Sequence, residues 1–222
     1  MEKKEIVLSG IRATGNLHLG NYFGALRNFV KMQNDYDCRF FIADLHALTT
    51  NPDPADLHVN VKNIVTEYLA AGIDPEKATI FVQSDVPEIS ELYLLLNMHV
   101  GIGELMRTAS FKDKARKALG IKTDSSTPTS PEDDNIEKEI IGSDSNKRVN
   151  AGLLTYPTLM AVDILIQKAN KVPVGKDQEQ HLELTRRFAR RFNSFYKTDL
   201  FPEPENYTFG AAAVKVPGLD GS

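Results

Sequence analysis

Short apolar segments alternate with longer helical ones along the chain, and this alternation constrains the fold more than any other feature. Strand-like segments lie at residues 5–9, 38–43, 79–83 and 171–174. Periodic apolar positions predict helices at residues 19–34, 54–71, 87–105, 155–168 and 177–193. Strands separated by helices indicate a parallel sheet, because each connection must cross back over the sheet. We therefore predict an α/β fold with a doubly wound parallel sheet.

Glycines mark the expected ends of two helices. Gly72 follows the periodic segment at 54–71 and should end that helix, as glycine commonly does. Gly101 and Gly103 fall near the end of the long apolar segment at 87–105. That segment is therefore predicted to be one helix, or a pair of helices broken at these glycines.

Residues 115–150 interrupt the alternating pattern. They are rich in Ser, Thr and charged residues and hold few large apolar ones, which is typical of an exposed or mobile insertion. Ser130 and Pro131, followed by two acidic residues, predict the start of a short surface helix inside it. Residues 1–222 are otherwise assigned to one domain, which their number allows.

Composition excludes several classes of protein. No segment approaches roughly 18 consecutive apolar residues, so no membrane-spanning helix is predicted. The single cysteine, Cys38, excludes an internal disulfide, a cysteine-rich zinc site and an iron–sulfur cluster, and we predict no metal held by the protein alone. The charged first residues lack the apolar core of a signal peptide. Together these features predict a cytoplasmic protein.

The formal net charge of −4 argues against a domain devoted to nucleic-acid binding, because such domains are usually basic. Any contact with nucleic acid should then be local. The best candidate is a group of basic residues at the end of the last predicted helix: Arg186, Arg187, Arg190, Arg191 and Lys197. Two interpretations stay open, a solvated helix face or a patch that contacts phosphates.

A glycine-rich segment follows the first strand and leads into a helix. It runs Ser9-Gly10-Ile11-Arg12-Ala13-Thr14-Gly15 and is followed by His18-Leu19-Gly20-Asn21. Backbone N–H groups and the helix dipole converge at such a turn, which suits a phosphate. The segment lacks both the dinucleotide-binding glycine pattern and the Lys-Ser/Thr of a P-loop. Its His-Leu-Gly-Asn tetrad is similar to the HIGH signature of class I aminoacyl-tRNA synthetases and related nucleotidyltransferases, although so short a pattern also occurs by chance.

The predicted helix at 155–168 places four side chains on one face: Tyr156, Met160, Asp163 and Gln167. Asp163 has apolar neighbours in the sequence, and a carboxylate in such surroundings needs a partner. It could form a structural salt bridge, cap a neighbouring loop, or accept a hydrogen bond from a ligand N–H.

The strand at 171–174 passes directly into Gly175-Lys176-Asp177-Gln178 and a helix. Open α/β sheets bind ligands at the carboxyl ends of their strands. Gly175 would allow a ligand to approach closely, and Asp177 and Gln178 can form hydrogen bonds with a ribose or an amino group.

Four segments together resemble bacterial-type tryptophanyl-tRNA synthetases: GNLHLGNYFGAL, ADLHALT, LLTYPTLMAVDIL and VPVGKDQEQHLELTRRFARRFN. They occur in the order and spacing of that class I family, and the resemblance spans nearly the whole chain except residues 115–150. It implies a Rossmann-like catalytic domain. It also implies activation of L-tryptophan with ATP and Mg²⁺ to tryptophanyl-adenylate, followed by transfer to tRNA(Trp).

Two alternatives to a tryptophan enzyme stay open. One is a synthetase of the tyrosine type, and the other is a synthetase-like module that binds nucleotide without catalysis. Tyrosine-type enzymes are similar in fold but carry glutamine where this chain has Met160. An indole N–H can only donate a hydrogen bond, so one acceptor, Asp163, beside the apolar Met160 suits tryptophan better than tyrosine.

The resemblance also implies roles for individual residues. The implied catalytic residues are His18, Asn21 and Lys114, the last at the position of a mobile lysine that reaches the phosphates. The implied ATP-binding residues are Arg12, Ala13, Thr14, Gly20, Asn21, Gly175, Lys176, Asp177 and Val216. The implied tryptophan-binding residues are Leu8, Gly10, His46, Tyr156, Met160, Asp163, Val172, Val174 and Gln178. Among these, Tyr156 and Gln178 are expected to hold the α-amino group.

The chain departs from the family pattern at several points. Arg12 stands where many members have glutamine, Leu8 replaces a frequent aromatic residue, and Asn21 replaces the second histidine of HIGH. The second signature, Lys-Met-Ser-Lys-Ser, is absent, as is the helical anticodon-binding domain. We therefore expect the chain to be the catalytic portion of a longer enzyme.

A homodimer is implied as well, because members of this family pair through the sheet edge and the helix after the third strand. In this chain, residues 91–106 are apolar on more than one helical face. The alternative interpretation is a helix buried in the core of one subunit.

Overall fold

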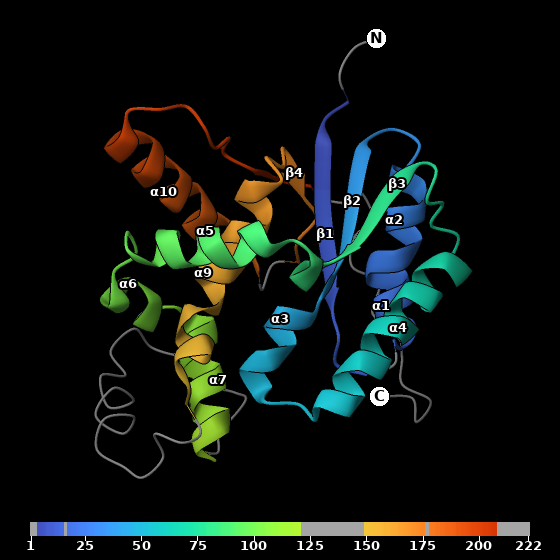
Figure 1. Cartoon of the computed structure of the whole chain (residues 1–222), viewed down its shortest axis with the longest axis horizontal. Coiled ribbons are helices and arrows are strands. Elements are labelled where there is room, and N and C mark those ends of the chain that lie inside the picture. The colour runs from blue at the N-terminus through green and yellow to red at the C-terminus, as the bar shows by residue number, and fades with distance from the viewer. Residues whose placement is uncertain (1–3, 16, 121–148, 176–177, 208–222) are drawn as a thin grey trace.

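Five parallel strands form one sheet in the computed structural model, which describes residues 4–15, 17–120, 149–175 and 178–207 (Figure 1). Their spatial order is β3-β2-β1-β4-β5, and every pair of neighbours runs parallel. The strands span Ile6–Arg12 (β1), Asp37–Ala43 (β2), Ala78–Val82 (β3), Lys171–Val172 (β4) and Glu205–Asn206 (β5). The chain winds outward from β1 in both directions, which confirms the predicted doubly wound α/β fold.

Helices cover both faces of the sheet (Figure 1). In the described ranges, no helix is long and apolar enough to cross a membrane. The helical elements are α1 (Leu19–Asn21), η1 (Tyr22–Leu26), α2 (Arg27–Met32), α3 (Asp44–Ala47), η2 (Leu48–Thr50), α4 (Pro54–Ala70), η3 (Gln83–Asp85), α5 (Pro87–Asn97), α6 (Ile102–Met106), α7 (Ala109–Leu119), α9 (Ala151–Ile166) and α10 (Glu179–Tyr196).

One face of the sheet packs against α2 and α4. Alternate residues of a strand point to opposite faces, so Phe40 of β2 enters this core while its neighbour Phe41 does not. The ring of Phe29 stacks on that of Phe40 with 4.5 Å between centroids, and Tyr68 meets Phe29 edge-on at 6.3 Å. This aromatic contact fixes α2 and α4 to the central strands.

The other face packs against α9 and α10, through contacts such as those of Leu8 with Ile164 and Leu182. The remaining sides of α9 are covered by α5 and α10, in a second core that includes Val162, Leu165 and Phe188. Because α9 is enclosed on most sides, it is apolar all round rather than along one stripe.

The predicted pair of helices at 87–105 is confirmed as α5 and α6. The break lies between Asn97 and Ile102, and Gly101 is the residue before α6. Gly103 lies inside α6, so it does not break the helix.

The first strand is longer than predicted. It continues through Arg12, so Gly10 lies inside β1 rather than in a turn. Phe41 is the cross-strand partner of Gly10, and a Cβ at position 10 would come within 2.5 Å of its ring. Gly10 is therefore required because the Phe41 ring lies across β1.

Two predicted boundaries around the insertion are wrong. The segment does not begin at residue 115, because α7 continues to Leu119 with Ala115 and Arg116 buried, and Gly120 ends it at a φ of 72°. The helix predicted from residue 155 begins earlier, because the Asn150 side chain accepts a hydrogen bond from the N–H of Leu153 and caps α9. Residues 121–148, with the predicted helix start at Ser130, lie outside the described residues.

The far edge of the sheet also differs from prediction. β4 ends at Val172, since Pro173 has no N–H to donate to a neighbouring strand. β5 pairs with β4 over two residues, and a segment so short carries no periodic signal in the sequence.

Replacing Phe29 by alanine should lower the free energy of unfolding by about 3–5 kcal/mol, because it leaves a cavity beside Phe40 and Tyr68. Phe195 is the matched control: it is 67% exposed, and Phe195→Ala should cost less than about 1 kcal/mol. Urea denaturation followed by circular dichroism measures both. Equal losses in the two variants would contradict this assignment of the core.

Candidate functional site

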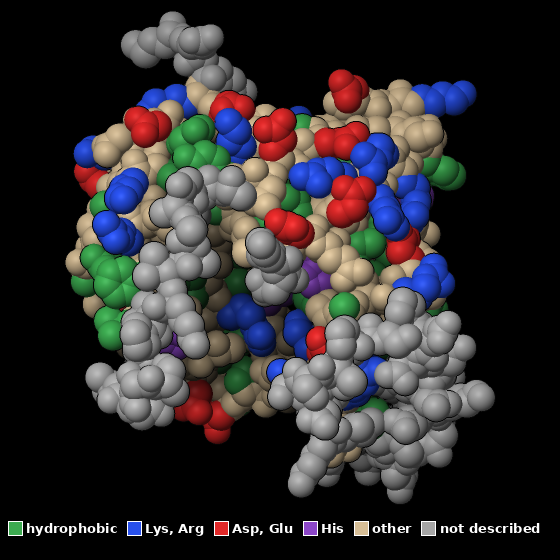
Figure 2. Space-filling view, turned by 180° about the vertical axis from the view of Figure 1, so that it is seen from behind, with side chains coloured by type: hydrophobic (Ala, Val, Ile, Leu, Met, Phe, Trp, Pro, Cys, Tyr) green, Lys and Arg blue, Asp and Glu red, His purple; other side chains and the backbone are tan. Residues whose placement is uncertain are grey.

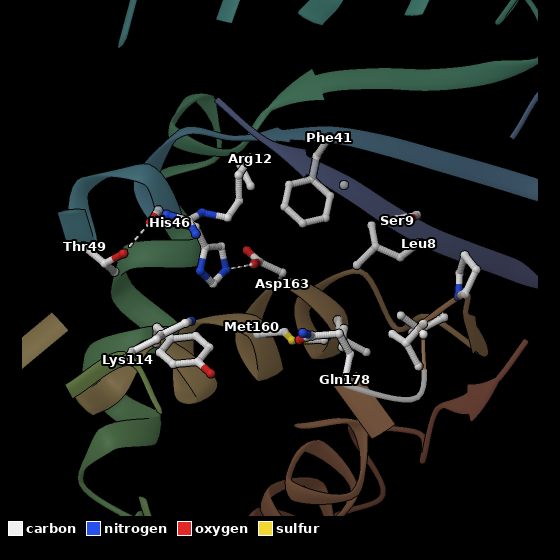
Figure 3. A pocket seen from close by; sticks show the side chains of 18 residues that line it. Leu8, Ser9, Arg12, Phe41, His46, Thr49, Lys114, Met160, Asp163 and Gln178 are labelled. Atoms are coloured by element: carbon white, nitrogen blue, oxygen red, sulfur yellow. Dashed lines mark hydrogen bonds and ion pairs between the residues drawn. The ribbon is translucent and has the colours of Figure 1, made fainter. Parts of the chain in front are cut away.

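A cavity of about 400 Å³ opens at the carboxyl ends of β1, β2 and β4, beside α9 (Figure 3). The direction of winding reverses between β1 and β4, and open α/β sheets bind ligands at such a point. Many of the predicted site residues line the cavity: Leu8, Gly10, Arg12, His46, Lys114, Tyr156, Met160, Asp163, Val172, Val174, Gly175 and Gln178. The wall also includes Ser9, Phe41, Ala43, Thr49, Ile164 and Pro173.

The Asp163 carboxylate lies at the base of the cavity with a side-chain exposure of only 2%. His46 Nε2 lies 2.9 Å from its Oδ2, and Gln83 Nε2 donates to its Oδ1 at 2.7 Å. Burial raises the pKa of Asp163, and the hydrogen bond from His46 opposes that rise. Asp163 therefore forms the predicted structural bridge, and it also lines the cavity.

His46 reaches Asp163 because the chain turns into α3 directly after β2. Asp44 stabilises this turn, since its Oδ1 accepts hydrogen bonds from the N–H groups of Leu45 at 3.0 Å and Ser84 at 3.1 Å. The Thr49 hydroxyl donates to the carbonyl of His46 at 2.8 Å. The backbone that carries His46 is thus fixed by hydrogen bonds both before and after this residue.

Tyr156 forms another part of the wall and is itself held from behind. Its hydroxyl lies 2.7 Å from Nε2 of the buried His181 on α10. On the cavity side, the Lys114 ammonium lies 3.3 Å from the centre of the Tyr156 ring, which is a cation–π contact. The structure therefore brings Lys114 of α7 and Tyr156 of α9 together.

Two cationic side chains share the cavity. Burial, together with the nearby positive charges of Arg12 and Lys117, lowers the pKa of Lys114 to about 8. Partial desolvation also lowers the pKa of Arg12, against the effect of Tyr156. Crowded, partly desolvated cations are stabilised by an anion, so this region suits a phosphate or carboxylate.

The opposite wall of the cavity is mostly apolar. Leu8 and Phe41 extend from the sheet, and Met160 faces them from α9 (Figure 3). The cavity therefore combines an apolar wall, one buried acceptor and a cationic region, which suits an amphipathic ligand with an anionic group.

The His18-Leu19-Gly20-Asn21 tetrad does not line the cavity, and neither do Ala13 and Thr14. Asn21 Oδ1 accepts a hydrogen bond from the N–H of His18 at 3.0 Å, which stabilises the start of α1. A Cβ on Gly20 would come within 2.9 Å of the His18 ring, so glycine makes room for the histidine. Thr14 is exposed, whereas Ala13 is buried in the core.

Comparison with known proteins identifies the family. A model described as "tRNA synthetases class I (W and Y)" matches residues 1–222. The chain belongs to this family.

Individual members of the family cover almost the whole chain. Tryptophan–tRNA ligase of Porphyromonas gingivalis is 60% identical over 218 residues, which are 98% of this chain and 58% of that protein. The ligase of Clostridium acetobutylicum is 46% identical over 206 residues, or 93% of this chain and 53% of that protein. The chain thus spans a little over half the length of the curated relatives it matches.

A solved structure agrees with this placement. The tryptophanyl-tRNA synthetase of Campylobacter jejuni, complexed with ADP and tryptophan, is similar with a TM-score of 0.78 and 36% sequence identity. The similarity covers 98% of this chain and 59% of that one. The Rossmann-like fold expected of class I synthetases is therefore present.

The four arginines of the basic group lie on α10, and each is paired with an acidic side chain. Arg190 donates to Glu203 at 2.6 Å, Arg186 to Glu183 at 3.2 Å, and Arg191 to Glu104 at 3.0 Å. Figure 2 shows the blue and red side chains interleaved over the region of α10. The solvated helix face is thus the interpretation that the structure favours over a phosphate-contacting patch.

Several residues of the site were not predicted from the sequence. This group includes Gln83, Phe41 and His181, which act through contacts with distant segments. It also includes Thr49, which bonds to the carbonyl of His46 three residues earlier. The one available signal was for Gln83, which directly follows a strand, at the edge where α/β sheets bind ligands. Three predicted ATP-binding residues, Lys176, Asp177 and Val216, lie outside the described residues.

The Lys114 ammonium should titrate with a midpoint near pH 8 instead of the ordinary 10.5, because burial disfavours its charged form. Lys114 is then mostly protonated below pH 8 and mostly neutral above it. Carbon-13 NMR of lysine-labelled protein, with the signal assigned through Lys114→Arg, measures the midpoint. A midpoint at the ordinary value would show that the ammonium is fully solvated.

Proposed function

We propose that this chain forms the tryptophan- and ATP-binding part of a tryptophan–tRNA ligase. The observation that carries the proposal is the Asp163 carboxylate, held by the buried Gln83 and the partly buried His46 at the base of a largely apolar cavity. The identity of 60% to a tryptophan–tRNA ligase supports it. Tryptophan, ATP and tRNA(Trp) are the proposed substrates of the whole protein.

The indole ring would lie between the sheet and α9, with its N–H on Asp163. An indole N–H can only donate, and Asp163 offers the acceptor that it needs. Leu8, Phe41 and Met160 supply the apolar contacts, together with Val172 and Val174. A tyrosine hydroxyl both donates and accepts, so a wall with Met160 in place of a polar amide favours tryptophan over tyrosine.

The α-amino and carboxylate groups of tryptophan would point toward the polar end of the cavity. Tyr156 and Gln178 are proposed to hold the amino group, while His46 and Gly10 complete the pocket. Arg12 and Lys114 would lie near the carboxylate and the α-phosphate of ATP, since both cations line the same cavity.

ATP would extend from the cavity toward the start of α1. His18, Gly20 and Asn21 are proposed to contact the phosphates there, with backbone groups of Ala13 and Thr14. On the other side, Gly175, Lys176 and Asp177 would hold adenine and ribose, with Val216 close to the base. The structure of the Campylobacter relative with ADP and tryptophan supports a site for both ligands.

The described residues form no cluster of three His, Cys, Asp or Glu side chains that could hold a metal ion. Mg²⁺ usually keeps several waters and binds substrate phosphates, so it fits this site as an ion carried by ATP. When bound, it would neutralise phosphate charge.

The proposed reaction has two steps. A carboxylate oxygen of tryptophan attacks the α-phosphorus of ATP, and the bond to the bridging oxygen breaks with release of pyrophosphate. A ribose hydroxyl of the tRNA then attacks the acyl carbon and AMP leaves. The described residues contribute alignment and charge stabilisation, since Lys114 and Arg12 offset the charge that develops on phosphorus oxygens.

Calorimetry should detect binding of L-tryptophan and not of L-tyrosine, and tryptophan should support exchange of pyrophosphate into ATP by the full encoded protein. Asp163→Ala should weaken tryptophan binding about 10- to 100-fold, because a hydrogen bond to a charged acceptor is lost. ATP affinity is the internal control and should stay within about threefold. Preference for tyrosine, or unchanged tryptophan affinity in the variant, would refute the proposal.

A cytoplasmic homodimer is part of the same proposal. Apolar side chains are exposed on α5, directly after it and on α6: Leu94 and Leu95, Met98, and Ile102. Such residues commonly mark protein–protein contacts when they are contiguous.

Light scattering should give twice the chain mass of 24.7 kDa at micromolar concentration. Leu95→Glu should shift the protein to the monomer, because a charge would enter the apolar contact. Leu19→Glu is the control, since Leu19 is also exposed but lies on α1. A monomeric mass for the unmodified protein would reject the dimer.

A further inference from the structure

Gln83 is a fully buried polar side chain that lies behind the cavity wall. It follows β3 directly, and its exposure is 0%. A buried amide must find partners for both its oxygen and its nitrogen, because an unpaired polar group costs about 1–3 kcal/mol. The partners of Gln83 therefore show what holds it in place.

The contacts of Gln83 fix the orientation of its amide. Its Oε1 accepts hydrogen bonds from the backbone N–H groups of Leu45 at 3.1 Å and His46 at 3.4 Å. Backbone N–H groups can only donate, so the oxygen must face α3 and the NH₂ group must face Asp163. Nε2 then donates to Asp163 Oδ1 at 2.7 Å, a shorter bond than the 2.9 Å one between His46 and that carboxylate.

The same side chain thus joins the two groups that face the ligand. It holds the backbone of His46 from one side and the carboxylate of Asp163 from the other. His46 Nε2 holds the second carboxylate oxygen, so each oxygen has one fixed donor. The carboxylate cannot rotate without breaking both bonds. These two bonds therefore fix the directions in which its oxygens can accept a further hydrogen bond.

We infer that Gln83 is a positioning residue for amino-acid selectivity: it aims the Asp163 carboxylate at the indole N–H of the substrate. This inference rests on the proposed function, because it assumes that tryptophan binds at Asp163. Gln83 does not line the cavity and acts on the ligand only through Asp163 and His46.

The test compares two ligands that differ in one hydrogen-bond donor. L-tryptophan carries the indole N–H, and β-(3-benzothienyl)alanine has a sulfur in its place. Calorimetry of the full chain should show that the unmodified protein prefers tryptophan about 10- to 100-fold. Gln83→Met should lower tryptophan affinity about tenfold, while affinity for the analogue changes less than about threefold.

Gln33 offers a matched control, because it is also a buried glutamine held at both ends of its amide. It donates to the carbonyl of Gly72 at 3.0 Å and accepts from the N–H of Asp74 at 2.8 Å, away from the cavity. Gln33→Met should reduce stability and leave the preference between the ligands unchanged. If Gln83→Met lowers the affinity for both ligands equally, Gln83 has a merely structural role and the inference is overturned.

The outcomes separate the two levels of the proposal. If the unmodified protein shows no preference for tryptophan, the proposed function fails. If it shows the preference and Gln83→Met retains it, only the role of Gln83 fails.

A second measurement needs no variant. In nitrogen-15 NMR of the unmodified protein, tryptophan should shift the Gln83 side-chain amide signal and the analogue should not. Equal shifts with both ligands would overturn the inference.

Discussion

The buried charge of Asp163 is the constraint on which the site depends. A carboxylate that is almost fully removed from water needs donors in fixed positions. These donors come from the segments that follow β2 and β3, whereas Asp163 itself lies on α9. α9 therefore has to pack against the sheet so that the Asp163 side chain lies opposite the ends of β2 and β3. The same packing leaves a cavity at the point where the winding of the sheet reverses.

The cavity joins chemical environments that a single segment could not supply. The sheet contributes Leu8 and Phe41, and Gly10 allows the ring of Phe41 to lie across β1. Lys114 enters from α7 and rests on Tyr156, which is held by His181 of α10. An apolar wall, a buried acceptor and a cationic region thus meet, and a ligand with an aromatic ring, an N–H and an anionic group matches all of them.

Much of the fold, and the need of Asp163 for hydrogen-bond partners, could be predicted from the sequence, because both depend on local patterns. Strand and helix periods are local, and an acidic residue among apolar ones is visible without a structure. Gly10 was misplaced because glycine-rich composition suggests a turn, whereas its cross-strand neighbour Phe41 decides its role. The start of the insertion was misplaced because a charged segment suggests solvent, although Arg116 is buried along α7. Gln83 carried no periodic signal, since its partner Asp163 lies 80 residues away.

The most direct test of this account is a crystal structure of the chain with L-tryptophan. The indole nitrogen should lie within about 3 Å of the Asp163 carboxylate, with the ring against Leu8 and Met160 and the bond from Gln83 retained. An indole ring bound elsewhere, or an indole N–H directed at a different acceptor while Asp163 faces away, would contradict it.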